Sequence, residues 1–102
     1  MRYILVDKTN IPFKQQIILE NKVVELRFSY NSSFDFFTID LYKDGVAVVQ
    51  GEKLVYGKPL FTIGDNILQN TIIVPYDIKG DTTRITYENF GVNVFLYVVE
   101  KE

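Results

Sequence analysis

Residues 30–61 read YNSSFDFFTIDLYKDGVAVVQGEKLVYGKPLF, and this stretch decides the fold class. Its first part alternates apolar and polar side chains with a period of two, which is typical of a β-strand with one buried face. Asp44-Gly45 follows that run and is a strong signal for a two-residue hairpin turn. Gly57-Lys58-Pro59 then changes the direction of the chain between apolar pairs. The stretch therefore predicts a twisted antiparallel β unit.

The same alternation continues on both sides of this stretch. It predicts strands at 2–6, 13–19, 23–30, 34–42, 46–49, 60–63, 71–74 and 92–99. One face of each of the four longest strands is expected to enter the core: Phe13, Gln15, Ile17 and Leu19; Val24, Leu26, Phe28 and Tyr30; Asp35, Phe37, Ile39 and Leu41; Val92, Val94, Leu96 and Val98. Residues 46–49 are apolar on both faces, so we expect that strand to be covered on both.

Turn signals separate these runs. Tight turns are expected at Asn21-Lys22, at 31–33 and at 64–66, and Pro75 is expected to end its strand because proline lacks a ladder donor. Residues 86–91 suggest a short helical turn, with Thr86 as N-cap and a terminating glycine. Eight or nine short strands with turns about every 8–12 residues predict an all-β fold, either an antiparallel sandwich or a small barrel, with at most one short helical turn.

Composition limits the function. The 102 residues are enough for one domain, which we expect to span residues 1–102. Eleven basic and thirteen acidic side chains are scattered and leave a net charge of −2, so the basic footprint of a nucleic-acid-binding protein is missing. No apolar run is long enough for a membrane-spanning helix, and the first residues do not form a signal sequence. We therefore expect no nucleic-acid or membrane partner, and residence in a cytoplasm or release by lysis.

The sequence contains no Cys and no His, which excludes disulfides, thiolate metal sites and the commonest general base. Two carboxylates can hydrolyse glycosides, and Glu25 and Asp40 are the candidates that adjacent strands would place on the same side. Solvated cross-strand charge pairs with Arg27 and Lys43 explain these acids better. Likewise, 77–81 superficially resembles a calcium loop but lacks the EF-hand spacing, so a plain turn is preferred. We expect no catalytic residue, metal or cofactor.

Several aromatic side chains fall on the face opposite the main core. Phe34, Phe36, Tyr42 and Tyr56 could form a second buried layer, a protein interface, or a platform on which sugars or single-stranded bases stack. Stacking of a ligand is the least favoured of the three, because we expect that basic residues do not interleave with the rings.

Read together, several segments resemble the baseplate plug family of contractile-tailed bacteriophages. The segments that carry the resemblance are Ile11-Pro12-Phe13, VELRFSYN at 24–31, FFTIDLY at 36–42, GEKLVYGKPLF at 51–61, and Ile73-Val74-Pro75-Tyr76-Asp77 with Gly80. The resemblance implies a non-enzymatic component of the tail baseplate near the central hub. It also implies contacts with hub, spike and tail-tube proteins, presence in several symmetric copies, a place in the virion, and assembly in the cytoplasm of the host bacterium.

The shared LVYGKPLF segment also has a direct physical interpretation. Gly57 permits a backbone conformation closed to other residues, Pro59 fixes the exit angle, and Leu54, Leu60 and Phe61 would anchor the turn in the core. The expected contact residues are Phe34, Phe36, Tyr42, Tyr56, Lys58 and Phe61, and the expected structural turn residues are Asn31, Gly45, Gly57 and Pro59.

Two other functions remain open at this point. One is a carbohydrate- or receptor-binding β module that uses Phe34, Tyr42 and Tyr56. The other is a small hydrolase based on Glu25 and Asp40.

Overall fold

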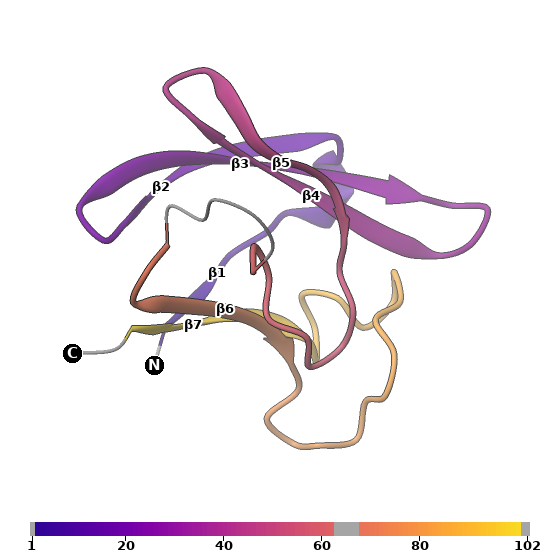
Figure 1. Cartoon of the computed structure of the whole chain (residues 1–102). Coiled ribbons are helices and arrows are strands. Elements are labelled where there is room, and N and C mark those ends of the chain that lie inside the picture. Colours follow the sequence, from indigo (N-terminus) through magenta and orange to yellow (C-terminus); the bar gives the residue numbers. More distant parts are fainter. Residues whose placement is uncertain (1, 63–67, 101–102) are drawn as a thin grey trace.

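The computed structural model describes residues 2–62 and 68–100, and within them the chain forms two antiparallel β-sheets. The four-stranded sheet has the order β2-β3-β4-β5 and the three-stranded sheet has the order β1-β7-β6. Figure 1 shows them as two facing layers. The elements are β1 (Arg2–Ile4), η1 (Lys8–Asn10), β2 (Phe13–Leu19), β3 (Lys22–Asn31), β4 (Phe36–Lys43), β5 (Val46–Lys53), β6 (Thr71–Tyr76) and β7 (Phe95–Glu100). The all-β prediction is confirmed, and the arrangement is a sandwich of open sheets rather than a closed barrel.

Two-residue turns set the register of the four-stranded sheet. Between β2 and β3 the turn is made by Glu20 (φ 52°) and Asn21 (φ 62°), which pairs Leu19 with Lys22. This turn lies one residue earlier than predicted. Between β4 and β5 it is made by Asp44 (φ 53°) and Gly45 (φ 77°), as predicted. Positive φ at both central residues is what twisted hairpins require, since it matches the twist of the flanking strands.

The core lies between the two sheets. The predicted inner faces of β3 and β4 are buried, and the buried side chains of the other layer meet them: Val24, Leu26, Phe28, Phe37, Ile39 and Leu41 on one side, and Ile4, Ile73, Val94, Leu96 and Val98 on the other. Two residues that were predicted to face the core do not lie on these inner faces. Asp35 lies in the turn before β4, and Val92 is exposed in the loop before β7.

Edge positions explain the strands that were predicted wrongly. β5 is an outer strand, and Val46 is 66% exposed, so coverage of residues 46–49 on both faces was wrong. β6 is also an outer strand and continues through Pro75 to Tyr76. A proline is tolerated there because an outer strand needs ladder donors on one side only. The predicted strand 60–63 is not formed by residues 60–62, and Ile63 and the predicted turn at 64–66 lie outside the described residues.

The LVYGKPLF segment is a corner that joins the two sheets. The Leu54 amide donates to the Phe37 carbonyl of β4 at 2.9 Å, which continues the pairing of β5. A turn follows in which Gly57 has φ 74° and the Lys58 amide donates to the Val55 carbonyl at 3.0 Å. The corner then contacts β6, because the amides of Gly57 and Leu60 donate to the carbonyls of Pro75 and Ile73, each at 2.8 Å. Leu54, Leu60 and Phe61 are buried beneath it.

Short turns complete the chain. Thr86 and Asn89 cap one another: the Asn89 amide donates to Thr86 Oγ1 at 3.2 Å, and the Thr86 amide donates to Asn89 Oδ1 at 2.8 Å. With the bond from the Phe90 amide to the Thr86 carbonyl at 3.0 Å, this forms the helical turn predicted at 86–91. The 3-10 turn η1 was not predicted. Among the described residues, no helix has the length and apolar character needed to cross a bilayer.

Candidate interaction surface

Phe34 lies at the tip of the turn between β3 and β4, and its side chain is 73% exposed. The turn that presents it is fixed by the side chains of Asn31, Arg84 and Asp35. Asn31 Oδ1 accepts from the Phe34 amide at 3.1 Å. Arg84 Nη2 donates to the carbonyls of Phe34 at 3.0 Å and Asp35 at 2.7 Å. The ring is therefore held outward on a backbone that is braced from both sides.

Asp35 is the centre of this brace. It has φ 55°, and its Oδ1 accepts from the Tyr30 hydroxyl at 2.7 Å and from the Tyr87 amide at 2.9 Å. Its Oδ2 accepts from Arg84 Nη1 at 3.4 Å. The hydrogen bond from Tyr30, followed by that from Tyr87, lowers the pKa of Asp35, while the same bond raises the pKa of Tyr30. Asp35 thereby fixes the β3–β4 turn to the loop that follows β6.

Arg84 and Tyr87 were not recognised from the sequence. They are 49 and 52 residues away from Asp35, and nothing in their local sequence indicates that they meet this turn. Beside the turn, a hollow of ≈ 550 Å³ is lined by Tyr30, Asp35, Thr86, Tyr87 and Glu88. The surface around Phe34 thus combines a projecting ring with a shallow, partly aromatic depression.

A second group of aromatic side chains lies on the outer face of the four-stranded sheet. Phe36 and Tyr42 share that face of β4, as predicted, and both are partly buried. The Arg27 guanidinium lies 3.8 Å from the Tyr42 ring centroid, and Lys53 Nζ lies 4.7 Å from that of Phe36. The expectation that basic residues do not interleave with the rings was wrong, because neighbouring strands supply the cations. One face of each ring is therefore already occupied.

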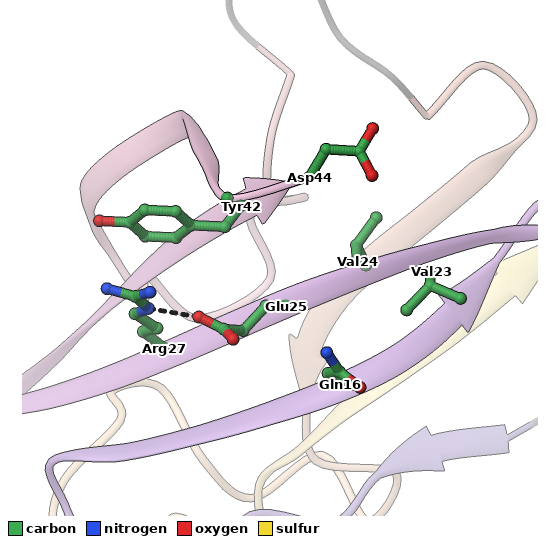
Figure 2. Close-up of a pocket in the computed structure, with 8 residues that line it drawn as sticks. Gln16, Val23, Val24, Glu25, Arg27, Tyr42 and Asp44 are labelled. Carbon is green, nitrogen blue, oxygen red and sulfur yellow. Dashed lines mark hydrogen bonds and ion pairs between the residues drawn. The ribbon is translucent and has the colours of Figure 1, made fainter.

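Figure 2 shows the hollow next to Tyr42, with Arg27 lying between the Tyr42 ring and Glu25. The hollow has a volume of ≈ 170 Å³, and its lining also includes Gln16, Val23, Val24, Asp44 and Gly45. Pockets for small ligands usually measure about 300–1,000 Å³. Glu25 accepts from Arg27 Nε, and this bond raises the pKa of Arg27. Within this hollow, the charges of Glu25 and Arg27 are therefore already paired with each other.

The remaining expected contact residues lie at the corner beside β6. Lys58 is exposed. Tyr56 is partly buried: its ring stacks on Tyr76 with centroids 5.6 Å apart, and its hydroxyl accepts from the Asp77 amide at 3.1 Å. Phe61 is 1% exposed, and its amide donates to Glu52 Oε1 at 3.1 Å. Phe61 therefore belongs to the core and not to a surface that a partner could reach.

The expected turn residues have the geometry that turns need. Gly45 and Gly57 have φ values of 77° and 74°, a region that favours glycine. Asn31 binds the Phe34 amide as described above, and Pro59 is partly buried within the corner.

The aromatic residues of the alternative carbohydrate-binding hypothesis are not gathered into one platform. Tyr42 lies on the outer face of β4, Tyr56 lies at the corner beside β6, and Phe34 lies at the turn beyond the other end of β4. Of the three residues, Phe34 is exposed, whereas the other two are partly buried.

Glu25 and Asp40, the two carboxylates of the hydrolase hypothesis, both lie on the outer face of the four-stranded sheet. Both form bonds within that sheet. Asp40 Oδ1 accepts from the Gly51 amide at 2.7 Å, at an irregularity in the pairing of β4 with β5. Glu25 is paired with Arg27, which itself lies opposite Asp40. Lys43 contacts Asp44 at 3.0 Å rather than Asp40 or Glu25. The predicted cross-strand charge pairs are therefore wrong in their partners: Glu25 pairs with Arg27 on the same strand, and Lys43 pairs with the adjacent Asp44.

The loop at 77–81 is a turn built on a buried carboxylate. Asp77 Oδ1 accepts from the Lys79 amide at 2.9 Å, and Oδ2 accepts from Thr82 Oγ1 at 2.7 Å. The Gly80 amide closes the turn on the Asp77 carbonyl at 2.9 Å. These bonds, that from Thr82 foremost, lower the pKa of Asp77. In the described part of the chain, no group of three or more acidic, His or Cys side chains is placed to hold a metal ion.

Stability is expected to fall in acid. The pKa values of Glu20, Asp35 and Asp77 are lowered by hydrogen bonds that the folded carboxylates accept, from the Gln69 amide first in the case of Glu20. Their stabilisation is complete above the unfolded-state values of about 4 and is lost as pH falls through the lower folded-state values. Thermal unfolding measured from pH 7 to 2 should show a flat upper range and a steep decline below about pH 4.

Asp35→Asn tests whether the Asp35 carboxylate contributes to this loss of stability in acid, because the asparagine amide cannot titrate. Its unfolding temperature should depend less on pH below about 4 than that of the wild type. An acid decline of equal steepness in both proteins would exclude Asp35 as a source of the effect.

A family model described as "Cyanophage baseplate Pam3 plug gp18" matches residues 1–101. A search among curated proteins finds no match. The family match confirms the resemblance that the sequence segments carry, and it includes every residue of the surface described above.

Proposed function

Because the chain belongs to the cyanophage Pam3 baseplate plug family and is a baseplate plug protein of a phage tail, we propose that it holds neighbouring tail proteins in place through the Phe34 turn. The partners are hub, spike or tail-tube proteins of a contractile tail, which the chain meets as one folded unit over residues 1–102. It would be present in several copies in the virion, after assembly in the host cytoplasm. This work requires no catalysis, cofactor, nucleic acid or membrane.

The exposed ring of Phe34 on a braced turn carries this proposal. Energetic centres of protein interfaces are usually a few aromatic or arginine side chains that enter a pocket of the partner. An anchor binds more tightly when its conformation is fixed beforehand, because less entropy is lost on binding. The bonds that Arg84 donates and those that the Asn31 and Asp35 side chains accept fix the Phe34 turn in this way.

The surroundings suit a contact with protein. Tyr87 lies beside the Asp35 brace and is partly exposed, with Lys8 Nζ 4.7 Å from its ring centroid. Aromatic side chains such as that of Tyr87 are enriched in interfaces. Phe36 and Tyr42 on the outer face of the four-stranded sheet and Lys58 at the corner are further proposed contact residues, and Arg27 and Lys53 support the two rings. We assign Tyr56 a supporting role at the corner and leave Phe61 out of the contact, since its side chain is buried.

Phe34→Ala should weaken binding to the tail partner by about 2 kcal/mol or more, roughly a thirtyfold rise in the dissociation constant. The measurement is co-purification with the hub, spike and tube proteins encoded nearby, followed by titration of the partner that is retained. Because the ring is exposed, the unfolding temperature should hardly change.

Val46→Ala is the matched control, since Val46 is another exposed apolar side chain beside a hairpin turn. It should leave binding unaltered. Equal binding by the wild type and Phe34→Ala would refute the role of this turn, and failure of the wild type to retain any tail protein would refute the proposed partners.

A further inference from the structure

The two open sheets end in four outer strands. Three of these are poorly suited to pairing with a strand of another chain, because they are covered, irregular or short. The corner covers β6 through the bonds to Pro75 and Ile73. The pairing of β5 is interrupted by register shifts on either side of Leu41, and β1 has three residues only. By contrast, β2 has seven residues in unbroken register with β3, from Phe13 opposite Phe28 to Leu19 opposite Lys22. Regular edges of this kind can pair with another strand.

The hairpin turn determines which backbone groups of β2 point outward. Leu19 and Lys22 flank a two-residue turn, so they form a hydrogen-bonded pair. Pairs alternate along an antiparallel ladder, and the amides and carbonyls of Ile17 and Gln15 therefore also face β3. Those of Lys14, Gln16 and Ile18 face away from it. The Ile18 carbonyl accepts a bond from Arg2 Nη2 at 3.3 Å, which leaves its second lone pair available.

The outward residues complement a second copy of themselves. If two β2 strands pair antiparallel with Gln16 opposite Gln16, then Lys14 of each copy lies opposite Ile18 of the other. Lysine never meets lysine in this register, and like charges directly opposite one another would be unfavourable. Ile18 is 61% exposed, and the aliphatic stem of the opposing lysine would cover it. Six backbone bonds are geometrically available, two at the central pair and two at each flanking pair.

We propose that the chain forms a two-fold dimer in which the β2 edges join the four-stranded sheets of two copies into one continuous sheet. Pairing of β2 with a different edge of the second copy is disfavoured, because the other three outer strands are covered, irregular or short. Identical edges meeting about a two-fold axis also give a closed assembly, whereas unlike edges would continue into rings or filaments.

Gln16→Pro tests the backbone pairing. Proline removes the outward amide of residue 16 but no bond to β3, so the monomer should keep its unfolding temperature within a few degrees. Sedimentation equilibrium should show a concentration-dependent dimer for the wild type and for Gln16→Ala. For Gln16→Pro the dissociation constant should rise at least about tenfold. A wild type that stays monomeric at high concentration, or undiminished dimerisation of Gln16→Pro, would overturn the proposal.

Cross-linking tests the register. The chain has no cysteine, so Gln16→Cys introduces a single thiol at the centre of the proposed interface. A short bifunctional thiol reagent should join two copies of this variant efficiently. Ser29→Cys is the control, because Ser29 is exposed on β3 rather than on the edge strand. Equal cross-linking of both variants would contradict pairing at β2.

This inference is independent of the proposed tail contact. Phe34→Ala should leave the monomer–dimer equilibrium unchanged, so either proposal can fail while the other stands. If the chain stays monomeric and Gln16→Pro instead reduces binding of a tail protein, the β2 edge takes a strand from that protein, and self-pairing is refuted.

Discussion

Replacing Phe37 with alanine is expected to lower the free energy of unfolding by about 3–5 kcal/mol, the range for a large buried aromatic residue. Phe37 is 0% exposed, and its ring lies 4.6 Å from that of Phe90 and 4.8 Å from that of Tyr30, centroid to centroid. It therefore connects the four-stranded sheet to the loop before β7. Domains of this size have a total stability of about 5–15 kcal/mol, so the variant would lose a large part of it.

Phe34→Ala is the matched comparison for this experiment. It removes the same side chain only three residues earlier, but from an exposed position. The wild type, Phe37→Ala and Phe34→Ala should be compared by urea unfolding. Phe37→Ala should show a large decrease in midpoint, whereas the free energy of unfolding of Phe34→Ala should fall by less than about 0.5 kcal/mol. Similar losses in both variants would mean that Phe37 does not support the core as described.

Gly57→Val is expected to lower the free energy of unfolding by about 2–3 kcal/mol, because a β-branched residue is strained at positive φ. Gly57 has φ 74° in the turn of the corner, and no atom lies within 4 Å of the position that a Cβ would take. The loss should therefore come from the backbone and not from a clash. Its amide also binds the Pro75 carbonyl, so a distorted turn would release one of the two bonds that cover β6.

Gly57→Asn separates backbone strain at positive φ from the effect of adding a side chain at this position. Asparagine tolerates positive φ better than other residues with a Cβ, and there is room for its side chain. Thermal or urea unfolding should rank the stabilities as wild type, then Gly57→Asn, then Gly57→Val. If asparagine and valine destabilise the chain equally, the positive φ is not the reason that the corner needs glycine.

Local patterns were sufficient to predict three strands of the four-stranded sheet, namely β2, β3 and β4. The period of two in β2, β3 and β4 identified the inner faces correctly, because each of these strands has one face towards the core and one towards solvent. The Asp44-Gly45 turn was also correct, since its residue types are those that positive φ demands. The turn at Glu20-Asn21 was predicted one residue too late in the sequence, because glutamate is an unusual choice for that conformation.

Contacts between distant parts of the chain could not be predicted in this way. Glu20 illustrates the reason: its carboxylate accepts from the amides of Gln69 at 3.0 Å and Asn70 at 2.8 Å, about fifty residues away. Backbone amides carry no residue-specific signal, so the sequence does not show which carboxylate will bind them. The same applies to the binding of the Tyr87 amide by Asp35. The candidate surface was therefore predicted in part: Phe34 was recognised, but the residues that brace it were not.

The pairing of β1 with β7 has a consequence for synthesis of the protein in the cell. Arg2 lies opposite Val98, so the three-stranded sheet joins segments that are almost a full chain length apart. A ribosome releases the N-terminal segment first, and β1 must wait, unpaired, until residue 98 has left the exit tunnel. The β2–β5 meander has no such dependence, since each strand pairs with the next. We therefore expect nascent chains to acquire the meander first and to close the second layer later, once β7 has emerged from the ribosome.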